Sequence, residues 1–168
     1  MIVIADAGPL HYLILDEHID LLPQFFGEVI IPTAVRDELM HPSAPSPVRA
    51  WLAAPPPWVQ CMAAARTNQS LALGPGEREA IALALELRAD LLLVDDKKAR
   101  HAAERYGIAV AGTLLLLKIA HDRGLLSFPD SVEKLRQSGF RLSSRLVEEI
   151  MGSDADQSED GSPRDDDK

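Results

Sequence analysis

Carboxylate side chains stand at the ends of two apolar runs of this sequence and inside two segments that are otherwise mostly apolar. Asp6 follows the first run, Asp95 and Asp96 follow the second, and Glu38 and Glu79 lie in helix-like segments. Carboxylates that come close repel one another unless a cation neutralises them, and hard divalent cations prefer oxygen ligands. If these segments meet in space, they form a site for Mg²⁺ or Mn²⁺, which is typical of an enzyme that acts on a phosphodiester.

Two of these acids have a simpler structural explanation that stays open at this stage. Asp6 precedes Ala-Gly-Pro, and Asp favours such turns. Glu38 has Val35 and Leu39 at helical spacing, so it lies near the buried edge of its helix and needs a partner. That partner is either a metal ion or a basic side chain.

The remaining acids are common at helix starts. Glu77 and Glu79 would both stabilise the dipole of the helix that they open, although Glu79 stands at the start of an enclosed apolar stretch. Asp95 or Asp96 would cap the helix that follows them, but one cap needs only one Asp. The second Asp is therefore unexplained by capping.

The sequence lacks the motifs of other common catalytic and binding sites. The five histidines are scattered without metal-ligand spacing, and Cys61 has no CxxC partner. The chain contains no G-x-S-x-G, no P-loop and no G-x-G-x-x-G. An acidic site built from oxygen ligands favours Mg²⁺ or Mn²⁺ over zinc.

Bulk composition predicts one domain over residues 1–151 and a disordered acidic tail over 152–168. The net charge is −9, of which the tail carries −5, with seven acids and two bases. This balance counts against tight nonspecific binding of nucleic acid in the absence of metal. A single cysteine and the lack of any long apolar run predict a cytoplasmic protein that does not associate with membranes.

Strand-like and helix-like segments alternate from end to end, which predicts a parallel sheet covered by helices on both faces. Sites in such folds lie at the carboxyl ends of the strands. The strands are expected at 2–5, 29–31, 58–62, 91–94 and 108–111. Helices are expected at 9–15, 18–26, 32–40, 48–52, 77–88, 97–106, 113–121, 129–137 and 143–151.

Four pieces of the sequence, in this order and at this spacing, resemble the PIN-domain family over about residues 1–150. They are Ile2-Val3-Ile4-Ala5-Asp6-Ala7-Gly8-Pro9-Leu10, Ile30-Ile31-Pro32 with Val35 and Glu38-Leu39, Gly76-Glu77-Arg78-Glu79-Ala80-Ile81-Ala82-Leu83-Ala84, and Leu91-Leu92-Leu93-Val94-Asp95-Asp96. Within the family, the chain is similar to small stand-alone proteins of the VapC toxin type.

The resemblance implies a three-layer α/β/α fold with a central, mostly parallel sheet, and metal-dependent ribonuclease activity. It also implies a homodimer and inhibition by a small antitoxin protein. By motif position, the catalytic and metal-binding acids would be Asp6, Glu38, Glu79 and Asp96, with Asp95 and Glu77 as auxiliary groups.

Two positions depart from the family pattern. Gly8 stands where such proteins commonly carry Ser or Thr, and Val94 stands where many carry Thr. Lost hydroxyls around a metal site cost about 10–100-fold in affinity or activity. Thr113 is a possible replacement hydroxyl, with helix capping as its other role.

The leading hypothesis is a Mg²⁺- or Mn²⁺-dependent endoribonuclease, acting as the toxin of a toxin–antitoxin pair. The alternative is a non-catalytic PIN-like module that binds RNA or a protein. A phosphatase of the haloacid dehalogenase type is less well supported, because it expects an Asp where the chain has Gly8.

Overall fold

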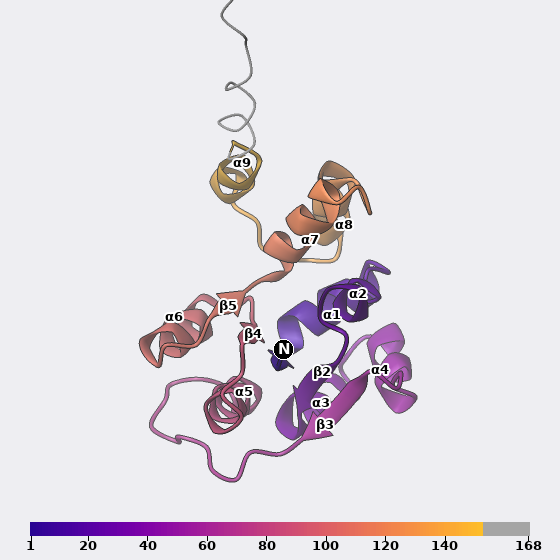
Figure 1. Cartoon of the computed structure of the whole chain (residues 1–168). Helices are drawn as coiled ribbons and strands as arrows, with labels where there is room; N and C mark the ends of the chain where they lie inside the picture. The colour runs from indigo at the N-terminus through magenta and orange to yellow at the C-terminus, as the bar shows by residue number, and fades with distance from the viewer. Residues whose placement is uncertain (153–168) are drawn as a thin grey trace, which may run out of the picture.

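Five short strands form one parallel sheet in the computed structural model, which describes residues 1–152 (Figure 1). The strand order is β3-β2-β1-β4-β5, and every neighbouring pair is parallel. With helices on both faces of this sheet, the predicted three-layer α/β/α fold is confirmed. The strands are β1 (Val3–Ala5), β2 (Val29–Pro32), β3 (Val59–Met62), β4 (Leu91–Leu93) and β5 (Val110–Ala111).

Alternate residues along the strands supply two separate apolar cores, one on each face of the sheet. In β1, Val3 and Ala5 pack on one face with α1 (Ala7–Leu15) and α7 (Thr113–Asp122), whereas Ile4 packs on the other. Figure 1 shows α1, α2 and α4 on the first side and α5 and α6 on the second. The remaining helices are α2 (Leu21–Phe26), α3 (Thr33–Leu39), α4 (Ser46–Ala53), α5 (Pro75–Glu86), α6 (Lys97–Arg105), α8 (Phe128–Gln137) and α9 (Ser144–Gly152).

The helix boundaries follow the sequence closely, with one clear exception. A helix was expected from residue 18, but α2 begins only at Leu21. The reason is the end of α1, where Glu17 has a φ of 60° and the N–H of His18 donates to the carbonyl of Leu13. That left-handed turn stops one helix before the next can start. The stop predicted at Gly107 is confirmed by its φ of 76°.

The sheet brings the first and fourth carboxylate segments together. Because β1 pairs with β4, Asp6 emerges beside Asp95 and Asp96, and the N–H of Asp6 donates to the carbonyl of Leu93 at 2.9 Å. Helix α3 follows β2 at the same edge and packs against α5. The four acidic segments thus converge at the carboxyl ends of the strands.

The tail predicted to be disordered lies, apart from Gly152, outside the described residues. Across residues 1–152, no helix combines the length and apolar character needed to span a membrane.

Candidate active site

A pocket of about 540 Å³ opens at the carboxyl ends of β1 and β4, between the start of α5 and the end of α3. Five acidic side chains line it together with small residues and Pro75. They are Asp6, Asp37, Glu38, Glu77 and Asp96. We call this cavity the acidic pocket.

Asp6 is the most enclosed acid of the acidic pocket, with 5% of its surface exposed. Its buried Oδ1 has no hydrogen-bond partner within residues 1–152. Burial raises the pKa of Asp6 to about 7, against a lowering by the N–H of Ala7, and the negative charges of Glu77, Glu38 and Asp95 raise it further. A buried carboxylate oxygen that lacks a donor calls for a proton or a cation.

Glu38 lies on the exposed side of α3 rather than at its buried edge, which differs from the sequence prediction. Its carboxylate nevertheless approaches α5, because a Cβ on Gly76 would meet Oε2 of Glu38 at 2.9 Å. Loss of hydration and the neighbouring Glu77 raise the pKa of Glu38. Gly76 therefore permits a close approach of two helices that also brings two acids together.

Two further acids of the acidic pocket each use one oxygen to start a helix. Oδ1 of Asp96 accepts the N–H of Ala99 at 2.9 Å, which caps α6. Oε2 of Glu77 accepts the N–H of Gly74 at 3.0 Å, at the start of α5. In each case the other oxygen has no protein donor within the described residues. These hydrogen bonds hold each side chain near its helix start and engage only one of its two oxygens.

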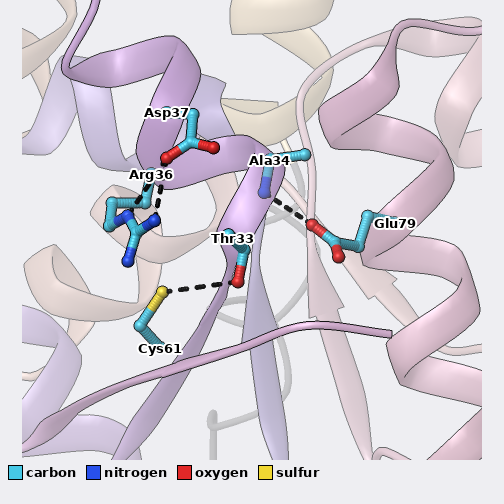
Figure 2. A network of polar contacts seen from close by, with 6 residues as sticks. All are labelled: Thr33, Ala34, Arg36, Asp37, Cys61 and Glu79. Carbon is cyan, nitrogen blue, oxygen red and sulfur yellow. Dashed lines mark hydrogen bonds and ion pairs between the residues drawn. The ribbon is translucent and has the colours of Figure 1, made fainter. Parts of the chain in front are cut away.

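Asp37 also lines the acidic pocket, but its charge is offset locally. Its Oδ1 accepts hydrogen bonds from Nε and Nη2 of the adjacent Arg36 (Figure 2). We therefore give it no direct part in the site.

Glu79 does not line the acidic pocket. Figure 2 shows its carboxylate directed at the start of α3, where Oε2 accepts the N–H of Ala34 at 2.5 Å. Its Oε1 accepts the N–H of Ala64, just after β3, at 3.0 Å. Glu79 is 8% exposed, and both of its oxygens satisfy buried backbone donors. Glu79 thus joins α5 to the start of α3 and to the segment after β3. Glu77, two residues earlier, lies near Asp6, where Glu79 was expected.

Asp95 is likewise fully occupied. Its Oδ1 accepts the N–H of Thr113 and its Oδ2 accepts the Thr113 hydroxyl, both at 2.7 Å. Burial raises the pKa of Asp95, whereas Thr113 and Arg100 lower it. A Cβ on Gly8 would lie 3.1 Å from Oδ2 of Asp95. A side chain at position 8 would therefore be in tight contact with Asp95, and Thr113 supplies the hydroxyl that orients Asp95.

The occupancy of the oxygens thus divides the predicted acids into two groups. One group lines the acidic pocket, and each of its members keeps an oxygen without a donor in the described part of the chain: Asp6, Glu38, Glu77 and Asp96. In the other group, Glu79 and Asp95 accept hydrogen bonds from backbone or hydroxyl donors with both oxygens.

The first group fits a hard divalent cation, because its free donors are all oxygens and one of them is buried without a partner. Within residues 1–152, no three acidic, His or Cys side chains are already close enough to share an ion. Metal binding would therefore require the more exposed Glu38, Glu77 and Asp96 to turn toward Asp6.

Comparison with known proteins agrees with this architecture. A family model described as a PIN domain (DUF3368) matches residues 2–155, and the chain belongs to the PIN-domain family. Members of this family typically are nucleases that use divalent metal ions. No curated protein sequence matches the chain.

A solved structure with a similar fold is among the matches. It is described as a PilT N-terminus domain protein from the hyperthermophilic archaeon Sulfolobus solfataricus P2. The two chains superpose with a TM-score of 0.51 and are 21% identical, over 69% of this chain and 90% of the other.

Replacing Asp6 by Asn should change the pH dependence of stability in EDTA. The pKa of Asp6 rises from 3.8 to about 7 on folding, so between these values the unfolded chain releases a proton that the folded protein keeps. Stability therefore falls as pH rises through this window. Asp6→Asn removes this pH dependence, so its free energy of unfolding relative to that of wild type should increase by about 2–3 kcal/mol from about pH 5 to about pH 8. Chemical denaturation at both pH values measures this, and an unchanged difference would contradict it.

Replacing Glu79 by Gln should destabilise the protein. Gln offers one acceptor oxygen, so either the N–H of Ala34 or that of Ala64 loses its partner. The expected loss is about 1–3 kcal/mol, or roughly 2–4 °C in Tm for each kcal/mol. Glu77→Gln keeps an acceptor for the N–H of Gly74 and serves as the matched control on the same helix. Equal melting temperatures for the two variants would show that Glu79 has no such role.

Proposed function

We propose that this protein is a metal-dependent endoribonuclease, with Asp6, Glu38, Glu77 and Asp96 as the acids of its active site. The observation that supports it is the convergence of these four carboxylates on one pocket, each with an oxygen that no donor within residues 1–152 occupies. Membership of a family of nucleases fits the same chemistry. RNA as the substrate rests on the resemblance to VapC-type proteins.

The four acids would have different tasks. Asp6 is buried and held at the end of β1, so it would provide the fixed ligand. Asp96 and Glu77 are oriented by the helix starts that they cap, and Glu38 would close the pocket from α3. Mg²⁺ or Mn²⁺, when bound, supplies an activated water and neutralises charge at the scissile phosphate. Asp95 and Thr113 would keep the β4 end in place.

The proposal extends to the biological setting. As a toxin of the VapC type, the protein would act in the cytoplasm, form a homodimer and be inhibited by an antitoxin protein. These expectations rest on the resemblance alone.

A non-catalytic PIN-like module remains the second candidate. Two observations favour it: the absence of three pre-assembled ligands within residues 1–152, and the net charge of −9. Such a module would keep the fold and bind RNA or a protein without cleaving it.

Glu77→Gln should abolish cleavage without lowering stability. The full chain is incubated with a structured RNA with Mg²⁺, with Mn²⁺ or with EDTA. Wild type should cleave only with metal, and Glu77→Gln should be at least about 100-fold slower, because the cation contributes several kcal/mol to charge stabilisation. Calorimetric titration with Mn²⁺ should show weaker binding by the same variant.

The control is Glu148→Gln, which removes an equal charge from an exposed position on α9. It should cleave as fast as wild type. Equal cleavage by wild type and Glu77→Gln would indicate a contaminating nuclease and would favour the non-catalytic module.

A further inference from the structure

A second pocket, of about 350 Å³, lies on the outer side of α5, away from the sheet ends. Its lining comes from the segment 66–71, from α5 and from Tyr106 after α6. We call it the arginine pocket because Arg66 and Arg78 both line it. It shares no lining residue with the acidic pocket, yet α5 contributes to both, with Glu77 on one and Arg78 on the other.

The arginine pocket carries a net positive charge, because two arginines and one glutamate line it. Arg66 and Arg78 form no ion pair within residues 1–152, and Nε of Arg78 is buried without an acceptor. The acid that lines the pocket, Glu86, is engaged elsewhere, since its carboxylate accepts the N–H groups of Ala65 and Arg66. An arginine that lacks a carboxylate partner can bind a phosphate through its guanidinium N–H groups. In a chain of net charge −9 such a cationic pocket requires an explanation.

An aromatic ring stands beside these cations. Tyr106 is 45% exposed, and its hydroxyl accepts a hydrogen bond from Nδ2 of Asn68 at 3.3 Å, which restrains the ring. A neighbouring hollow continues past Tyr106 to a third arginine, Arg105. Guanidinium groups next to an accessible aromatic ring form the combination that binds the phosphate and the base of unpaired nucleotides.

We propose that the arginine pocket is a subsite for one nucleotide of a single-stranded RNA, with its phosphate on Arg66 and Arg78 and its base stacked on Tyr106. This subsite rests on the proposed function, because it assumes that the substrate is RNA. It deepens that function by naming an unpaired strand as the substrate. Since Arg78 directly follows Glu77, a strand bound in the acidic pocket can continue around α5 into this subsite.

The proposal excludes duplex RNA as the preferred ligand. In a duplex the bases are stacked on one another and cannot lie on a protein ring.

Binding is tested in EDTA, where no metal-dependent cleavage can occur, by fluorescence anisotropy of a short fluorescein-labelled single-stranded RNA with the full chain. Arg78→Gln and Tyr106→Leu should each weaken binding about 5- to 100-fold. Tyr106→Phe keeps the ring and should bind within about twofold of wild type. Arg136→Gln, which removes an exposed charge from α8, should also bind like wild type.

The salt dependence separates a phosphate contact from a structural effect. Losing one phosphate contact on a single strand should reduce the slope of log K against log salt by about 0.7 in Arg78→Gln. Thermal melting of each variant checks that the fold is kept.

The outcomes distinguish this inference from the proposed function. Weaker binding by Arg78→Gln and Tyr106→Leu, without any cleavage by wild type, would support the subsite and overturn the nuclease. Metal-dependent cleavage with unchanged binding by both variants would overturn the subsite and leave the nuclease standing. No binding of RNA by wild type, or equal binding of duplex and single strand, would also overturn the subsite.

Discussion

The two backbone hydrogen bonds accepted by Glu79 are the interaction on which the site depends. They hold the start of α3 at Ala34 and the segment after β3 at Ala64 against one helix. Because α3 carries Glu38 and α5 carries Glu77, the same bonds fix the distance between two acids of the pocket. One buried carboxylate, fully satisfied by the main chain, thereby supports others that are left unsatisfied.

The same arrangement brings several negative charges close together in the acidic pocket. Asp6 is buried among three other acids, and the protein offers no basic partner for its Oδ1 within residues 1–152. A hydrophobic or neutral residue there would relieve the strain, so the acid is retained at a cost in stability. Such costs are typical of functional sites.

The fold and the strand-end acids could be predicted from the sequence because both depend on local patterns. Apolar runs ending in Asp marked β1 and β4, and the parallel pairing of strands placed Asp6 beside Asp96. Local patterns could not predict whether Glu77 or Glu79 lines the acidic pocket, because both stand at the start of α5. The packing of α5 on α3 decides which face of α5 meets the pocket. One available signal was that Glu79 lies four residues before Leu83, on the buried face of the helix.

Gly8 illustrates the same limit. Seen in the sequence alone, Gly8 indicated a missing hydroxyl. In the structure, Asp95 lies directly beside Gly8 and accepts its hydrogen bonds from Thr113, more than 100 residues away along the chain from Gly8. When a distant residue supplies the hydroxyl that a nearby position lacks, the sequence around that position gives no sign of it. The arginine pocket was missed for a similar reason, because Arg66, Arg78 and Tyr106 come from three separate segments.

The different roles of Glu77 and Glu79 have an evolutionary consequence. Under the proposed function, a lineage that gave up cleavage would be free to lose the charge of Glu77, since a neutral Gln still accepts the N–H of Gly74. Glu79 would persist, because its loss weakens the whole molecule. Under the proposed function, an acid at the position of Glu77 is expected only in relatives that cleave, whereas an acid at the position of Glu79 is expected wherever the architecture is intact.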